Sequence, residues 1–222
     1  MNNKFNIEIF DNHIIAIIND KRVLLDTGAP FSFSDGSYLE ILGEKYNFPP
    51  DSFGVTINNI NNLLGTQINV FLGLDVLNKL NFLIEWSKNN IYFSSEPIKI
   101  DAVRIYPDFS YGPPLLNVRI EDKLLKVYFD TGAKISYMKS EITSCYPLVG
   151  KAKDFYPILG HFETNIYELP ITLADYTFKI KVGNLPSILQ SFLDMMGNPD
   201  GVLGNDVFGY FVIFVLISLI KN

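Results

Sequence analysis

Two aspartates stand in the same four-residue setting at two places in the chain. The string Asp-Thr-Gly-Ala occurs at 26–29 and again at 130–133. Two carboxyl groups held a few ångströms apart cannot both ionise easily, so such a pair keeps one proton over a wide pH range. A pair in that state can accept a proton from water while it hydrogen-bonds a carbonyl oxygen. We therefore predict acid–base hydrolysis, with Asp26 and Asp130 as the catalytic residues.

The residues after each aspartate suit a loop that holds a carboxylate. Glycine tolerates a tight turn, and the loop amides can hydrogen-bond the carboxylate. A threonine hydroxyl in each loop can bond the backbone of the opposite loop and lock the two together. We expect six residues to support the pair: Thr27, Gly28, Ala29, Thr131, Gly132 and Ala133.

The same run of elements leads to each motif. Residues 14–29 read IIAIINDKRVLLDTGA, and residues 115–133 read LLNVRIEDKLLKVYFDTGA. Both runs hold an apolar strand, a turn with Asp-Lys and a second β-rich strand, which predicts a β-hairpin that delivers an aspartate at a strand end. An apolar-apolar-Gly element also recurs at 71–77 and 202–208, and the aspartate two residues after its glycine indicates a helix N-cap.

This repetition predicts two lobes in one chain. We place an N-terminal lobe with Asp26 at 1–98, a proline-rich linker at 99–113 and a C-terminal lobe with Asp130 at 114–222. An amphipathic helix is expected at 186–196. The apolar run at 210–220 is shorter than the roughly 20 residues that span a bilayer, so we expect a buried strand pair there and no membrane anchor.

Composition argues against several other classes of protein. The net charge is −6 and no Lys/Arg cluster occurs, so nucleic acid is not an expected partner. Cys145 is the single cysteine, which excludes an internal disulfide; we expect it to be a small core residue. Only two histidines are present, too few for a usual zinc site, and we expect neither a metal nor another cofactor. No signal-peptide pattern precedes the first hairpin, so we expect a cytoplasmic protein.

These motifs resemble those of retropepsin-like aspartic proteases, with two such halves fused as in the bilobal pepsins. The resemblance rests on the two Asp-Thr-Gly-Ala strings and on the elements that contain Gly73 and Gly204, and more weakly on Ser32 and Ser136. It implies an all-β, bilobal, pepsin-like or retropepsin-like acid protease fold with pseudo-twofold symmetry and a few short helices. It also implies a peptide cleft between the lobes.

The implied activity is that of an aspartic endopeptidase, in which water attacks the peptide bond without a covalent intermediate. The implied partner is a peptide or protein substrate in an extended conformation, and we expect a monomer because one chain supplies both aspartates. Ala29 and Ala133 stand where pepsins more often have a hydroxyl that would lower a carboxyl pKa. Their presence predicts activity at less acidic pH than that of the pepsins.

The resemblance also implies a flap, a hairpin that covers the cleft. The second half is longer between its aspartate and its glycine motif, and residues 157–164 read as a hairpin tip. We expect the main flap there, with Leu159, Gly160, His161 and Phe162 as substrate-binding residues. An ordinary surface hairpin is the alternative. Residues 53–57 of the first half are a weaker flap candidate.

Two other functions stay open at this point. The runner-up is a protease-fold module with weak or no activity that binds extended peptides by adding them as a strand. The shortened first half favours it, and the presence of both aspartates speaks against it. Phosphoryl chemistry is a third and weaker hypothesis, because the chain has no glycine-rich phosphate loop with its lysine.

Overall fold

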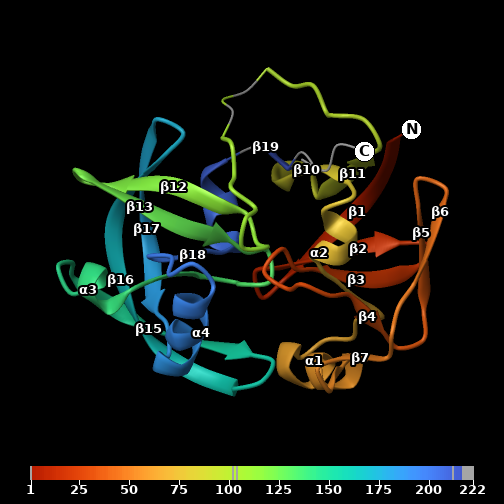
Figure 1. The fold of residues 1–222 in the computed structure, drawn as a ribbon, viewed down its shortest axis with the longest axis horizontal. Coiled ribbons are helices and arrows are strands. Elements are labelled where there is room, and N and C mark those ends of the chain that lie inside the picture. Colours follow the sequence, from red (N-terminus) through yellow and green to blue (C-terminus); the bar gives the residue numbers. More distant parts are fainter. Residues whose placement is uncertain (1, 102, 104, 212, 217–222) are drawn as a thin grey trace.

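The computed structural model describes residues 2–101, 103, 105–211 and 213–216 (Figure 1). Strands dominate these residues, and the helices are few and short. The strands form two large sheets, which make two lobes that lie side by side in Figure 1. The prediction of an all-β, bilobal fold is confirmed.

The first sheet has eight strands in the order β19-β10-β11-β1-β2-β3-β9-β4. Its strands are β1 (Asn2–Phe10), β2 (His13–Ile18), β3 (Lys21–Leu25), β4 (Phe33–Ser34), β9 (Val70–Leu72), β10 (Asn81–Glu85), β11 (Asn90–Ser94) and β19 (Ile213–Leu216). Two small hairpins accompany it: β5 (Tyr38–Ile41) with β6 (Glu44–Asn47), and β7 (Asp51–Ser52) with β8 (Val55–Thr56). The turn between β2 and β3 uses Asn19 and Asp20, whose φ values of 49° and 60° suit a tight hairpin.

The second sheet has seven strands in the order β12-β13-β18-β14-β17-β16-β15. They are β12 (Leu115–Ile120), β13 (Lys123–Phe129), β14 (Ser136–Met138), β15 (Leu148–Tyr156), β16 (Gly160–Leu173), β17 (Tyr176–Asn184) and β18 (Gly201–Leu203). A further pairing of Arg119 with Thr172 joins β12 to β16. The long β15–β16 hairpin extends from this lobe toward α1 of the first lobe (Figure 1).

Both lobes build the end of the aspartate strand in the same way. β3 runs parallel to β9, and β13 runs parallel to β18. The amide of Asp26 donates to the carbonyl of Leu72 at 2.9 Å, and the amide of Asp130 donates to the carbonyl of Leu203 at 2.9 Å. These bonds fix each aspartate at the carboxyl end of a buried strand.

The glycine after each of those neighbouring strands is required by close packing. A Cβ on Gly73 would lie 2.8 Å from the carbonyl oxygen of Phe31, and one on Gly204 would lie 2.6 Å from that of Ala133. Backbone atoms cannot yield to a side chain at such distances. The repeated apolar-apolar-Gly element therefore marks the place where each aspartate loop packs on its neighbour.

Strands β2 and β3 bury both of their faces. In β3, Val23 and Leu25 join the main core, while Leu24 points the other way, as successive side chains of a strand must. Leu24 belongs to a second buried group, here called the cleft-side cluster, which consists of Ile15, Leu24, Phe33, Ile57, Ile60, Leu64, Ile68 and Phe71. The continuous apolar run at 14–18 is explained by these two cores.

The helices are α1 (Ile57–Leu64), α2 (Leu74–Leu77), α3 (Ser140–Thr143), α4 (Ser187–Met195), η1 (Trp86–Lys88) and η2 (Asn205–Tyr210). The helix expected at 186–196 is confirmed as α4. The expected aspartate N-caps are wrong, because the N-cap residues of α2 and η2 are Gly73 and Gly204. α1 was not expected; it begins with a capping box in which Thr56 and Asn59 bond each other's backbone amides.

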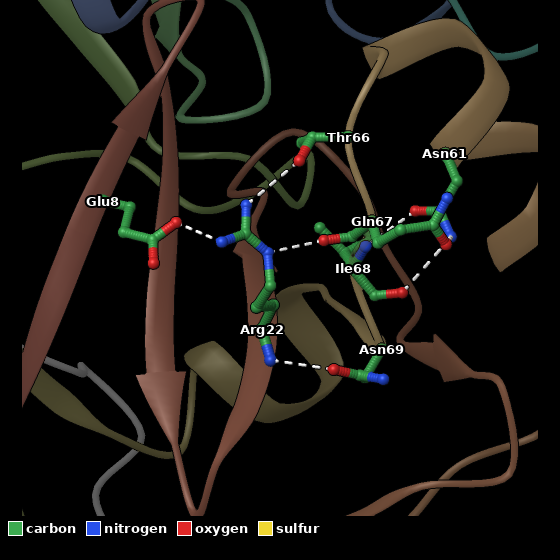
Figure 2. A network of polar contacts seen from close by, with 7 residues as sticks. All are labelled: Glu8, Arg22, Asn61, Thr66, Gln67, Ile68 and Asn69. Atoms are coloured by element: carbon green, nitrogen blue, oxygen red, sulfur yellow. Dashed lines mark hydrogen bonds and ion pairs between the residues drawn. The ribbon is translucent and has the colours of Figure 1, made fainter.

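A polar network ties the strand that carries Asp26 to the segment after α1 (Figure 2). The guanidinium of Arg22 on β3 pairs with Glu8 and donates to the carbonyl of Gln67 at 2.6 Å. Asn61 of α1 accepts the Ile68 amide at 2.8 Å, so the same segment is also held from the helix. The network fixes the base of β3 between β1 and the approach to β9.

The C-terminal strand lies in the sheet of the first lobe. β19 pairs with β10 from Ile213 opposite Glu85 to Leu216 opposite Phe82. Of the buried strand pair expected at 210–220, the structure describes one strand, β19, over 213–216, while residue 212 and residues 217–222 lie outside the described residues. The proposed boundaries of 1–98, 99–113 and 114–222 remain a prediction. In the part of the chain that the structure describes, no helix is long and apolar enough to cross a membrane.

Cys145 corrects one expectation. Its side chain is exposed, not part of a core, and its thiol is free. It follows α3, where the chain turns at the surface of the second lobe toward β15.

Candidate active site

Asp26 and Asp130 come from different lobes and meet where the lobes face each other. Each is the first residue beyond its strand, β3 or β13, and the two carboxyl groups are hydrogen-bonded to each other. Both aspartates line one cavity. The two carboxyl groups that the sequence predicts to form a pair therefore lie next to each other in the structure.

The two threonines bond across the lobes. Thr27 Oγ1 donates to the carbonyl of Phe129 at 2.9 Å and accepts the Thr131 amide at 3.0 Å. Thr131 Oγ1 donates to the carbonyl of Leu25 at 2.9 Å and accepts the Thr27 amide at 3.0 Å. Both side chains are fully buried. Each hydroxyl thus bonds the backbone on both sides of the opposite aspartate, as donor to the residue before it and as acceptor from the residue after it.

Gly28 and Gly132 are needed for close approach, and residues 130–133 also form the expected turn, in which the Ala133 amide donates to the carbonyl of Asp130 at 3.3 Å. Neither residue has a positive φ. A Cβ on Gly28 would overlap the carboxyl group of Asp130, and a Cβ on Gly132 would overlap that of Asp26. Each glycine leaves room for the carboxyl group of the other lobe.

The surroundings of the pair favour retention of a proton. Burial raises the pKa of Asp26 well above its usual value, and the neighbouring charge of Asp130 raises it further. Burial also raises the pKa of Asp130, while the Gly132 amide and the shared hydrogen bond with Asp26 act in the opposite direction. Burial and the neighbouring charge thus favour the protonated form, most clearly at Asp26.

Direct amide donors differ between the two lobes. Asp26 Oδ1 accepts the amides of Gly28 and Ala29, each at 2.8 Å. Asp130 Oδ1 accepts the Gly132 amide at 2.7 Å, while the Ala133 amide donates to the main-chain carbonyl of Asp130 at 3.3 Å. The Gly28 and Ala133 amides also lower the pKa of Asp130. The two loops therefore share a sequence but do not hold their carboxylates identically.

In each lobe, a serine that follows the aspartate loop bonds to the glycine motif. Ser32 Oγ donates to Asp75 Oδ1 at 2.5 Å and accepts the Gly73 amide at 2.9 Å. Ser136 Oγ donates to Asp206 Oδ1 at 2.6 Å and accepts the Gly204 amide at 3.0 Å. The serines and the helix aspartates, which the sequence suggested separately, thus form one structural pair in each lobe.

Asp206 gives a prediction about stability and pH. Burial raises its pKa to about 6 from 3.8, so the folded state binds a proton more tightly than the unfolded state does. The stability from this proton is complete below about pH 4 and is lost as pH rises through about 6, with an amplitude of ~3 kcal/mol. Asp206→Asn should flatten the fall in unfolding free energy between those pH values, measured by urea denaturation. Parallel curves for the two proteins would contradict this.

The cavity that contains the pair is mostly apolar. Its volume is about 260 Å³. The first lobe contributes side chains of the cleft-side cluster, including Leu24, Phe33 and Phe71, and the second lobe contributes side chains of α4, including Leu189 and Phe192. Apolar walls around a few polar groups are typical of a ligand pocket.

The β15–β16 hairpin borders the same cavity. The side chains of Tyr156, Pro157, Ile158 and Phe162 line it. Burial raises the pKa of the Tyr156 hydroxyl, and the charges of Asp26 and Asp130 raise it further. Of the four expected flap residues, Phe162 lines the cavity and Gly160 takes the turn position with φ 79°, whereas Leu159 and His161 are exposed and do not line it.

Phe155 anchors this hairpin on the other lobe. It packs against the cleft-side cluster and stacks on the buried His13, with ring centroids 5.4 Å apart. One strand residue before it, Asp154 accepts a hydrogen bond from the Tyr137 hydroxyl. Sequence reasoning missed Tyr137, Asp154, Phe155 and Tyr156, because no local motif marks them; only their place before the expected hairpin tip could have suggested them.

The weaker flap candidate at 53–57 is a short hairpin, β7–β8, that runs into α1. Phe53 and Val55 line the cavity, but Phe53 is 81% exposed. The first lobe therefore presents a helix where the second lobe presents a long hairpin. In the described residues, no group of three or more His, Cys, Asp or Glu side chains is placed to hold a metal ion.

No protein-family model matches the chain, and no curated protein matches it. Among solved structures, it is similar to a foamy viral protease–reverse transcriptase in complex with an RNA/DNA hybrid, with 15% sequence identity and a TM-score of 0.36. The match covers 49% of this chain and 13% of the viral chain.

Proposed function

We propose that the protein is an aspartic endopeptidase that hydrolyses peptide bonds in extended segments of peptides or proteins. The observation that carries this proposal is the cross-lobe contact of two carboxyl groups, each placed by an equivalent strand, loop and threonine. Structural needs alone do not explain it, because burying two adjacent carboxyl groups is unfavourable. Such costly arrangements of titratable groups gather at functional sites.

The chemistry follows from one proton shared by two carboxyl groups. The ionised carboxylate takes a proton from a water molecule, whose oxygen bonds to the carbonyl carbon of the substrate. The protonated carboxyl group hydrogen-bonds the carbonyl oxygen and neutralises the charge that develops there. The tetrahedral intermediate then collapses as its C–N bond breaks: the nitrogen takes the proton that the first carboxylate received from water, and the second carboxyl group recovers its proton from the intermediate as the product carboxyl group forms. Both carboxyl groups return to their starting state.

The β15–β16 hairpin acts in this proposal as the flap. An extended substrate would lie between the aspartate pair and Tyr156, with its side chains in the apolar walls. We propose that a monomer suffices, because both lobes of one chain complete the pair. The free Cys145 suits a reducing compartment such as the cytoplasm.

The anchoring of the hairpin gives a prediction about substrate binding. Phe155→Ala removes the ring that packs on the first lobe, so the closed position of the hairpin should be less populated. We expect KM to rise about tenfold, equivalent to ~1.4 kcal/mol. Steady-state kinetics on a cleaved peptide would measure it.

Phe53→Ala is the matched control. It removes the same ring from the small hairpin of the first lobe, where the side chain is largely exposed. We expect little change in KM. An effect as large as that of Phe155→Ala would assign the covering role to the first lobe instead.

The proposed function is tested with a diverse peptide library at roughly pH 3 to 8, with and without a pepstatin-type inhibitor. We expect cleavage at internal peptide bonds, loss of cleavage with the inhibitor, and an optimum less acidic than that of the pepsins. Mass spectrometry of the products would also define the preferred sequence. Intact peptides at every pH would reject the proposal.

A further inference from the structure

Asn205 is a fully buried polar residue directly beneath one of the two aspartates. It is the first residue of η2 and has no exposed surface. Its Nδ2 donates to the carbonyl of Thr131 at 2.8 Å. Because only the amide nitrogen can donate to a carbonyl, this bond fixes which way the side-chain amide points.

The peptide group that receives this bond is the one that binds Asp130. The carbonyl of Thr131 and the amide of Gly132 belong to the same planar unit, and the Gly132 amide donates to Asp130 Oδ1 at 2.7 Å. A hydrogen bond to the carbonyl polarises the amide at the other end and strengthens its bond to the carboxylate. Two hydrogen bonds thus connect Asn205 to Asp130 through one peptide group, and this connection is here called the relay.

The first lobe has no such relay. Leu74 follows Gly73 as Asn205 follows Gly204, and its side chain has no donor. Asp26 instead accepts two direct amides, from Gly28 and Ala29. The relay therefore reaches Asp130 alone of the two, in addition to the amides that act on it directly.

Packing does not account for Asn205. Its Oδ1 is buried and has no hydrogen-bond partner among the described residues, which disfavours the folded state. Leu74 shows that an apolar side chain of similar size fits the equivalent place in the other lobe. A residue that is retained although it leaves a buried acceptor unpaired is a candidate for a role in the reaction.

We propose that Asn205 is a positioning residue that strengthens the Gly132 donor, so that Asp130 carries the negative charge and Asp26 the proton. This inference rests on the proposed function and assigns its roles: Asp130 first takes the proton from water, and Asp26 first hydrogen-bonds the substrate carbonyl. The shared hydrogen bond, which raises the pKa of Asp26 and opposes the rise at Asp130, agrees with this order. Tyr156 from β15 faces the pair, and the titratable side chains of Asp154, Tyr137 and Tyr128 line the same cavity.

The test compares the full-length protein with Asn205→Leu, which gives the second lobe the residue of the first. We expect the acidic limb of the kcat/KM profile to move up by about half a pH unit, with roughly a threefold loss of kcat/KM on that limb. Thermal stability should change little, because the variant removes the unpaired Oδ1 while the Thr131 carbonyl loses its donor. A residue with only a structural role would lower stability and leave the pH profile in place.

A second readout separates this inference from the proposed function. Carboxyl ¹³C NMR titration of the aspartates, assigned with Asp26→Asn and Asp130→Asn, follows the pair without any substrate. An unchanged titration and pH profile in Asn205→Leu would overturn the inference, even in an active enzyme. Absence of cleavage by the wild-type protein would reject the proposed function, while the titration would still decide whether Asn205 acts on Asp130.

Substitutions by alanine provide a second comparison if leucine at position 205 prevents folding. Asn205→Ala removes the donor, and Leu74→Ala shortens the equivalent residue of the other lobe. Both leave a cavity, so both should lower stability, but only Asn205→Ala should shift the titration of the pair. Equal titration shifts in the two variants would overturn the relay.

Discussion

Asparagine in place of either Asp26 or Asp130 should abolish peptide cleavage, with turnover reduced by roughly 10²- to 10⁴-fold or more. Each substitution keeps the shape of the side chain but removes the shared proton, so water can no longer lose a proton to one group while the other hydrogen-bonds the carbonyl. Folding should be preserved or improved, because two buried like-charged groups no longer compete for ionisation. Initial rates on a cleaved peptide and thermal melting would measure both effects.

Asp122→Asn is the control for this experiment. Asp122 lies at the exposed turn between β12 and β13, on the hairpin that carries Asp130. Its substitution should leave turnover unchanged. The same comparison tests the alternative of a peptide-binding module. Such a protein would bind extended peptides without turnover, and Asp26→Asn would leave its affinity for them nearly unchanged. That pattern would reject the protease proposal.

The second large effect is expected at the buried threonines. Thr27→Val keeps the volume of the side chain but removes the hydroxyl that bonds Phe129 and Thr131. Two buried backbone groups then lose their partner, each at a cost of about 1–3 kcal/mol, so we expect unfolding free energy to fall by ~2–6 kcal/mol. Activity should fall as well, since the two loops lose part of their alignment. Urea denaturation and kinetics at one pH would show both losses.

Thr27→Ser separates the hydroxyl from the methyl group. Serine keeps both cross-lobe bonds and loses only one buried methyl, for which roughly 1 kcal/mol is expected. Most of the stability and activity should therefore remain. If the serine variant were as unstable as the valine variant, packing and not hydrogen bonding would hold the lobes together at this point.

The sequence predicted those parts of the fold that local patterns specify. The hairpins before Asp26 and Asp130 and the helix at 186–196 follow from turn residues and apolar spacing, and the structure has them. The duplicated motif also predicted that the two aspartates would meet. No such pattern exists for α1, because its capping box has Asn59 where glutamate or glutamine is usual, so its start carried a weak signal.

Other parts depend on contacts between distant segments. No residue near Ser32 or Ser136 indicates that each would bond an aspartate of the later glycine motif. In the sequence, Asn205 also cannot be distinguished from an ordinary residue at the start of a helix. Phe155 and Tyr156 belong to the site only because the hairpin of the second lobe contacts the first lobe, which no local pattern indicates. Cysteines in general tend to be buried, but Cys145 is exposed because it lies in the surface turn after α3.

The pairing of β19 with β10 has a consequence for how the protein is made. Translation reaches Ile213 128 residues after Glu85, which at 5–20 residues per second is roughly 6 to 26 seconds. Until then β10 is an unpaired edge, open to the partner strands of neighbouring nascent chains. The sheet that supports Asp26 is completed only after both halves of the pair exist. Completion of this sheet therefore waits until translation has passed Leu216.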